Sequence, residues 1–225
     1  MPTPSRHPVP AAAVELLLER GFDATSVDEL AAAAGVSRST FFRRYGSKED
    51  MVFSDQEDRI RAAAQALDGT SGPGALVPAA LAVFDHHTSN QRLSQLRHEL
   101  LHRVPALRDR ELISTHRFER LFRTFLLEGG SGRDPLPDAR RTSAVALAAA
   151  VVAVHNDHLR AWLRSPSAQV RPRLEAALLE LVRRHGAAGA AVAGGGAATV
   201  VVVTAADQSP QAVAAAVERT LRERG

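Results

Sequence analysis

Residues 35–51 read GVSRSTFFRRYGSKEDM and contain four cationic side chains, Arg38, Arg43, Arg44 and Lys48. No acidic residue lies between Arg38 and Lys48. Ser37 is a favourable helix N-cap and Gly46 a favourable stop, so the segment predicts a short helix between them. Phe41 and Tyr45 are four positions apart and are therefore expected to share the face that packs inward. The opposite face then carries arginine and hydroxyl side chains, which are suited to contact base edges and phosphates of nucleic acid.

Another short helix is predicted directly before this one, where the sequence reads SVDELAAAAG over residues 26–35. Ser26 and Glu29 form an S-x-x-E capping box, and apolar residues then repeat at helical spacing until Gly35. Two short helices joined by a glycine-containing turn have the form of a helix-turn-helix, whose second helix can lie in the DNA major groove. Arginine-rich helix faces are also common as plain solvated surface, so this spacing alone leaves both interpretations open.

The longer stretch FDATSVDELAAAAGVSRSTFFRRYGSKEDMV, residues 22–52, resembles the DNA-binding domain of TetR/AcrR-family transcriptional regulators. The resemblance covers about residues 10–55. It implies a three-helix DNA-binding domain, a connecting fourth helix, and a C-terminal helical domain that dimerises and holds a ligand pocket. Two positions depart from the family's usual pattern, since Phe42 replaces a tyrosine and Gly46 a common proline. Phe42 lacks the hydroxyl that would bond phosphate, so only a packing or apolar role is expected there.

The resemblance also implies which residues contact DNA. Two of them, Ser26 and Lys48, are expected at backbone phosphates, and the second helix of the helix-turn-helix supplies base or phosphate contacts. The complete expected set is Ser26, Ser37, Arg38, Ser39, Thr40, Phe42, Arg43, Arg44 and Lys48.

The remainder of the chain predicts an all-α protein through about residue 185, with about nine helices in total. The fourth helix is expected to run unbroken from its Ser47 cap to about Leu67. Apolar residues at helical spacing predict the bundle helices near residues 75–88, 90–103, 106–128, 137–164 and 168–185.

Three domains follow from these boundaries. We expect a helix-turn-helix domain at residues 1–55, a ligand-binding and dimerisation helical domain at 56–185, and a tail at 186–225. The tail begins as a Gly/Ala linker, and its β-branched run TVVVVT at 199–204 indicates an extra strand. A further helix is predicted at 209–222.

Composition excludes several classes of protein. The chain of 225 residues contains no cysteine, which rules out disulfides, thiolate catalysis and thiolate metal sites. It has no Gly-rich phosphate loop and no nucleophile elbow, so we expect no catalytic residues, no cofactor and no enzyme. No stretch is well suited to span a bilayer, so we expect a cytoplasmic protein without a membrane partner.

Histidines in the C-terminal helices form pairs at helical spacing, which is also compatible with metal binding. Because no third ligand is evident in the sequence, we expect a polar cavity lining and no metal. The cluster at residues 155–158 can line a pocket or lie at a dimer interface, and the sequence does not choose between them. The expected ligand-binding residues are His98, His102, Phe122, His155, His158 and Trp162.

These features together predict a homodimeric, ligand-responsive transcriptional regulator that binds a palindromic DNA operator. We expect a repressor that is released by a small, largely apolar effector, with activation as the open alternative. A protein of another class also fits, namely a helical small-molecule-binding protein that does not bind DNA.

Overall fold

The computed structural model describes residues 9–128 and 138–193. Residues 1–186 form one compact unit, and residues 187–225 fall in a second. Every regular element in the described ranges is a helix, which confirms the all-α prediction. The strand and helix predicted at 199–204 and 209–222 lie outside the described residues.

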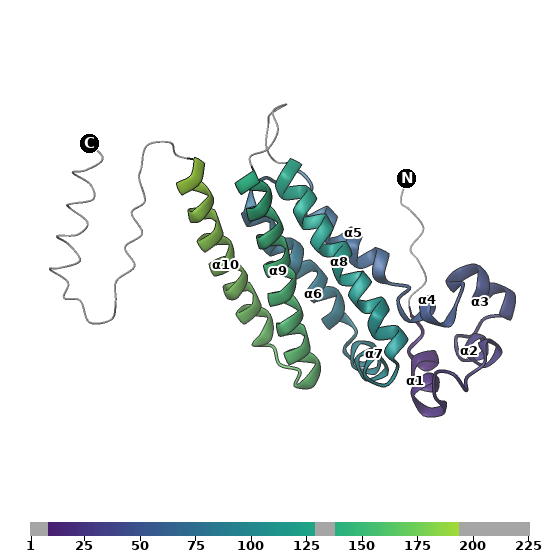
Figure 1. Ribbon diagram of the computed structural model, residues 1–225. Coiled ribbons are helices and arrows are strands. Elements are labelled where there is room, and N and C mark those ends of the chain that lie inside the picture. Colours follow the sequence, from purple (N-terminus) through teal and green to yellow (C-terminus); the bar gives the residue numbers. More distant parts are fainter. Residues whose placement is uncertain (1–8, 129–137, 194–225) are drawn as a thin grey trace, which may run out of the picture. The chain divides into compact units, whose positions relative to one another are not determined.

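Ten α-helices and one short 3-10 helix follow one another along the described part of the chain (Figure 1). Five of them lie close to the bundle helices expected from apolar periodicity. In chain order the elements are α1 (Ala11–Arg20), α2 (Val27–Ala33), α3 (Arg38–Tyr45), α4 (Lys48–Val52), α5 (Gln56–Leu67), the 3-10 helix Pro73–Ala75, α6 (Leu76–Ser89), α7 (Gln91–Arg103), α8 (Pro105–Glu128), α9 (Asp138–Arg164) and α10 (Val170–Ala193).

The expectation of one unbroken helix from Ser47 to Leu67 is wrong, because the chain leaves the α-helical path between α4 and α5. The amide of Ser54 bonds the Met51 carbonyl and the amide of Gln56 bonds the Phe53 carbonyl, which are tight i to i−3 contacts. The sequence contains no glycine or proline at this point. The break instead coincides with Asp55, whose carboxylate is buried against side chains from α5, α6 and α7.

Two hydrophobic cores hold the described helices together. The first unites α1 to α4 with apolar residues of α7 and the start of α8, including Leu93, Leu100 and Leu107. The second lies among α5, α6, α8, α9 and α10. Since α7 packs against α1, the helix-turn-helix does not stand apart from the bundle but shares its core with a bundle helix.

Candidate functional site

The turn between α2 and α3 is built from local signals. The Ser26 hydroxyl accepts from the Glu29 amide and the Glu29 carboxylate accepts from the Ser26 amide, so the predicted capping box forms. Gly35 has φ 67°, a left-handed conformation that favours glycine. Ser37 then caps α3 by accepting from the Thr40 amide at 3.2 Å. The helix-turn-helix geometry expected from the sequence is therefore present.

The C-terminal end of α3 explains why glycine stands at position 46. Gly46 ends the helix with φ 81°. Proline is fixed near φ −65° and cannot adopt that conformation. A chain that ends α3 in this way therefore needs glycine at this position.

The two faces of α3 separate as expected. Phe41 is fully buried and Tyr45 is 8% exposed, and both belong to the first core. Phe42 is 44% exposed, which is unusual for a large aromatic side chain. Ser37, Arg38, Ser39, Arg43 and Arg44 are exposed as well, while Thr40 is half-buried. Most of the residues predicted to contact DNA are thus accessible to a partner.

Within the described part of the chain, Arg38 makes only solvent-exposed interactions. Its guanidinium donates to Asp28 Oδ2 at 2.6 Å and lies 5.4 Å from the centre of the Phe42 ring. Both charged side chains of the pair are about three-fifths exposed. Exposed ion pairs contribute at most about 1 kcal/mol, so Arg38 can exchange Asp28 for a phosphate or a base at little cost.

Lys48 has a structural role in addition to the phosphate contact predicted for it. Its ammonium group donates to the carbonyls of Phe22 at 2.7 Å and Thr25 at 3.0 Å. It also lies 4.9 Å from the centre of the Phe22 ring. Two of its three N–H donors therefore tie the start of α4 to the loop between α1 and α2.

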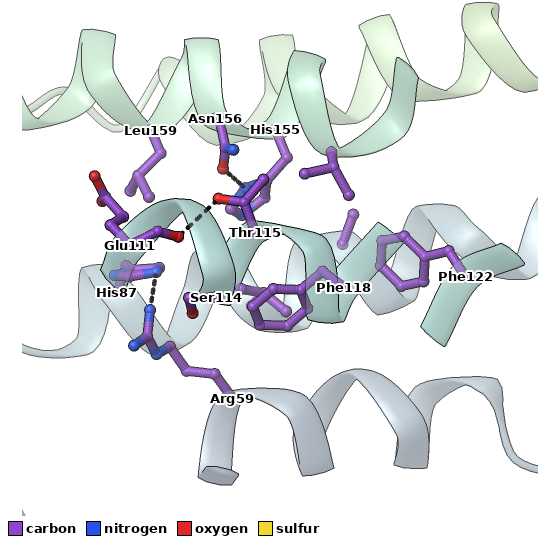
Figure 2. Close-up of a pocket in the computed structure, with 13 residues that line it drawn as sticks. Arg59, His87, Glu111, Ser114, Thr115, Phe118, Phe122, His155, Asn156 and Leu159 are labelled. Carbon is purple, nitrogen blue, oxygen red and sulfur yellow. Dashed lines mark hydrogen bonds between the residues drawn. The ribbon is translucent and has the colours of Figure 1, made fainter. Parts of the chain in front are cut away.

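A separate internal cavity lies among α5, α6, α8 and α9, with a volume of about 60 Å³ (Figure 2). In this view, Phe118 and Phe122 lie at one end of the cavity, and Arg59 and His87 lie at the other. His155 and Asn156 close it from α9. We call this space the inner cavity. Among the residues expected to bind a ligand, Phe122 and His155 line it.

An ionic cluster lies beside the polar end of the inner cavity. Arg59 donates to Asp55 Oδ1 at 3.3 Å, and Arg97 donates to Asp55 Oδ2 at 3.0 Å. A further Arg59 nitrogen donates to His87 Nε2 at 3.1 Å. His86 Nε2 is 3.4 Å from Asp55 Oδ2. Arg59 therefore faces the cavity and pairs with the carboxylate at the α4–α5 break.

Burial and charge set the protonation of this cluster. Burial alone would raise the pKa of Asp55, but the Arg97 charge, the His86 hydrogen bond and the Arg59 charge together hold that pKa far below its ordinary value. Burial lowers the pKa of the Arg59 guanidinium to about 10 against the attraction of Asp55. Burial and the nearby Arg59 charge also lower the pKa of His87 well below its usual range. Burial lowers the pKa of His155 to about 4. At neutral pH Arg59 is charged, Asp55 is ionised, and His87 and His155 are neutral.

A second, wider cavity of about 450 Å³ lies among α7, α8 and α9. We call it the outer cavity. It shares Glu111, Thr115, Asn156 and Leu159 with the inner cavity, so the two spaces adjoin. His98 and His102, both expected to bind a ligand, line the outer cavity.

The last two expected ligand-binding residues lie elsewhere. His158 is not among the residues that line either cavity, and its Nδ1 is 2.9 Å from the carbonyl oxygen of Val154. Trp162 is buried in the second core, with its ring 6.3 Å from that of Phe84. Over the described ranges, no group of three or more His, Asp or Glu side chains is arranged to hold a metal ion.

Sequence reasoning missed Arg59, Arg97 and His87. A signal for the two arginines was present, since Arg97 interrupts an apolar stripe at helical spacing and Arg59 begins one. In α7 the buried residues are Leu93, Ser94, Arg97, Leu100 and Leu101, and in α5 they are Arg59, Ala63 and Leu67. A charged residue in such a stripe indicates a buried partner.

Comparison with known proteins finds similarity concentrated in the N-terminal helices. Residues 11–54 match the family described as bacterial regulatory proteins, tetR family. MftR of Mycobacterium tuberculosis, described as a candidate transcriptional regulator of mycofactocin biosynthesis, is 43% identical over 49 residues. That match covers 22% of this chain and 25% of the relative, so the chain spans only a quarter of that relative's length.

Among solved structures, the TetR family transcriptional regulator PfmR from Thermus thermophilus is 22% identical, with a TM-score of 0.49. The alignment covers 78% of this chain and 97% of PfmR. In the part of the chain that the structure describes, no helix is both long and apolar enough to cross a membrane.

Proposed function

Because the chain belongs to the TetR family of bacterial regulatory proteins through residues 11–54, we propose that it is a transcriptional repressor that binds a palindromic operator as a homodimer and is released by a small molecule. Proteins of this family regulate transcription and are not enzymes. A repressor of bacterial genes acts in the cytoplasm, where its operator lies.

The outward face of α3 is the observation that carries this proposal. Arg38, Ser39, Arg43 and Arg44 are exposed on a helix that is fixed from behind by buried Phe41. A rigidly anchored helix of this kind can lie in the major groove, where arginine bonds guanine edges and hydroxyls bond phosphates. Phe42, exposed beside Arg38, can make an apolar contact such as one with a thymine methyl group.

The outer face of α9 supports a homodimer. Val145, Ala146, Ala149 and Ala153 are all exposed and lie on adjacent turns of one helix. On α10, Leu179 is 54% exposed. A solvated helix face ordinarily carries charged or polar side chains, so an uncharged face of this length is suited to a second copy of the chain. Two copies also place two recognition helices on a palindrome, about 34 Å apart.

The ionic cluster could couple ligand binding in the inner cavity to the conformation of the DNA-binding domain. Arg59 lines the inner cavity on α5 and pairs with Asp55 at the end of the DNA-binding domain. A ligand that binds the conformation with wrongly spaced α3 helices more tightly shifts the population toward that conformation. A coupling free energy of about 1–3 kcal/mol changes operator affinity roughly 5- to 150-fold.

The proposal is tested by selecting bound duplexes from a random DNA pool with the purified full-length chain. We expect enrichment of a two-fold symmetric sequence, protected as two half-sites in a footprint. In vitro transcription from a promoter that contains the selected site should then fall when the chain is added. Failure to enrich any sequence would refute the DNA-binding proposal, and increased transcription would identify an activator instead.

A further inference from the structure

We propose that the inner cavity binds a small organic carboxylate, with the carboxylate at Arg59 and an apolar chain directed toward Phe118 and Phe122. Its role as the effector rests on the proposed function, whereas its binding depends on the cavity alone. The ligand carboxylate would supply a second negative charge beside Arg59, in addition to Asp55, that the described buried side chains of the protein do not supply.

The buried charges around Arg59 do not balance. Arg59 is 7% exposed and Arg97 is 5% exposed, and both pair with Asp55, the one buried carboxylate in the described ranges. Within those ranges, Nε of each arginine is buried without a hydrogen-bond partner. Buried charge is costly unless it is paired and hydrogen-bonded. A ligand carboxylate at Arg59 would supply the missing negative charge.

The neighbouring histidines do not remove this imbalance. His87 accepts a hydrogen bond from Arg59 through Nε2, so its proton lies on Nδ1 and the ring is neutral. His155 donates through Nδ1 to Asn156 Oδ1 at 3.2 Å, so Nε2 of the neutral ring is an acceptor, and this atom is buried without a partner in the described part of the chain. The polar end of the inner cavity thus offers an anion one buried donor group, the Arg59 guanidinium. Among the described residues the acid that lines this cavity is Glu111, which is exposed and attracts Arg59 from the cavity's edge with the outer cavity.

The opposite end of the inner cavity is apolar. Phe118 and Phe122 lie there in Figure 2, and the cavity lining as a whole also includes the apolar side chains of Ala80, Val83 and Val152. A molecule with one charged end and one apolar end matches this division. Because the cavity volume is only about 60 Å³, a short chain fits without rearrangement and a longer chain must displace aromatic side chains.

The outer cavity favours the approach of an anion. It is lined by Arg108, Arg160 and Arg164, and Glu111 is the only acid among the described residues that line it. Cations around a cleft concentrate negatively charged ligands near its mouth. Glu111, Asn156 and Leu159 line both cavities, so the arginine-lined outer cavity adjoins the space in front of Arg59.

Isothermal titration calorimetry on the full-length chain tests the inference without DNA. The titrants are butyrate, hexanoate and octanoate, with hexanol and hexylamine as neutral and cationic counterparts. We expect saturable binding of at least one carboxylate, about 10- to 100-fold tighter than hexanol, as charge-assisted hydrogen bonds allow. Equal affinity for hexanol, tighter binding of hexylamine, or no binding of any carboxylate would overturn the inference.

Three variants then locate the carboxylate. Arg59→Gln should weaken carboxylate binding about 10- to 100-fold and leave hexanol affinity unchanged. Arg97→Gln removes an equally buried arginine that does not line either cavity, so it should retain the preference for carboxylate. Glu111→Gln, at an exposed position, should tighten carboxylate binding and weaken hexylamine binding. Retention of carboxylate binding by Arg59→Gln, or its loss only in Arg97→Gln, would contradict the assignment.

Neither outcome depends on DNA binding. If the chain binds hexanoate through Arg59 but binds no operator, the carboxylate site is supported and the proposed regulatory function is refuted. If the chain binds an operator but no carboxylate, the regulatory function is supported and the carboxylate site is refuted. If Arg59→Gln does not fold, the preference of the unchanged chain among hexanoate, hexanol and hexylamine still decides the inference.

Discussion

Replacement of Asp55 by asparagine should destabilise the protein strongly at neutral pH. The carboxylate is 9% exposed and pairs with two arginines that are buried to a similar degree. Removal of one partner from a buried ion pair typically costs about 3–5 kcal/mol, because the remaining charge stays buried without compensation. The asparagine side chain still accepts a hydrogen bond, so we expect about 3 kcal/mol for Asp55→Asn.

The assay is urea denaturation of both proteins at several matched protein concentrations, because the proposed dimerisation would make apparent stability depend on concentration. Asp58→Asn is the control, since Asp58 also pairs with an arginine on α5 but both side chains are partly exposed. That pair is expected to contribute less than about 1 kcal/mol. If the two substitutions lower the free energy of unfolding equally, the buried cluster does not stabilise the fold as argued.

The pH dependence of this difference has a defined sign. The folded-state pKa of Asp55 is depressed, so its contribution is fully present above the unfolded value of about 3.8. It is lost as pH falls through the folded-state pKa. The stability difference between the unchanged chain and Asp55→Asn should therefore stay constant from neutral pH to about pH 5 and shrink in more acidic solution.

Three further substitutions test the DNA-binding surface and the dimer. Arg43→Ala should leave the free energy of unfolding unchanged, because the side chain is exposed, and should weaken operator binding in fluorescence anisotropy by about 1–3 kcal/mol if it reads a base. Lys48→Ala should lower thermal stability, because it removes two hydrogen bonds to loop carbonyls, and should flatten the salt dependence of DNA binding for all sequences alike. Val145→Asp, at a position that is 45% exposed in one chain, should shift the protein toward monomer in light scattering without loss of helical circular dichroism; an unchanged dimer would place the interface elsewhere.

The helix-turn-helix could be predicted from sequence because its determinants are local. The Ser26–Glu29 capping box, the Ser37 cap and the glycines at positions 35 and 46 each act within a few residues. The inward face of α3 likewise follows from the four-residue spacing of its buried aromatics. Apolar periodicity located the bundle helices for the same reason.

The α4–α5 break and the inner cavity depend on distant residues instead. Asp55 is buried through Arg97, which lies 42 positions later in the chain. The sequence between α4 and α5 contains neither glycine nor proline, so it gives no local signal for the break, which coincides with this tertiary contact. Phe122 and His155 line one cavity because α8 and α9 pack side by side, and no local pattern distinguishes them from Trp162, which is buried in the core.

Fluorescence anisotropy of the full-length chain with DNA that flanks its own coding sequence tests the central claim most directly. A scrambled duplex is the control, and both are measured over a series of salt concentrations. Recognition by the exposed face of α3 predicts nanomolar binding to the flanking duplex, saturation at one or two dimers per site, and much weaker binding to the scrambled one. Equal binding to both duplexes that disappears together as salt rises would contradict sequence-specific recognition at these sites.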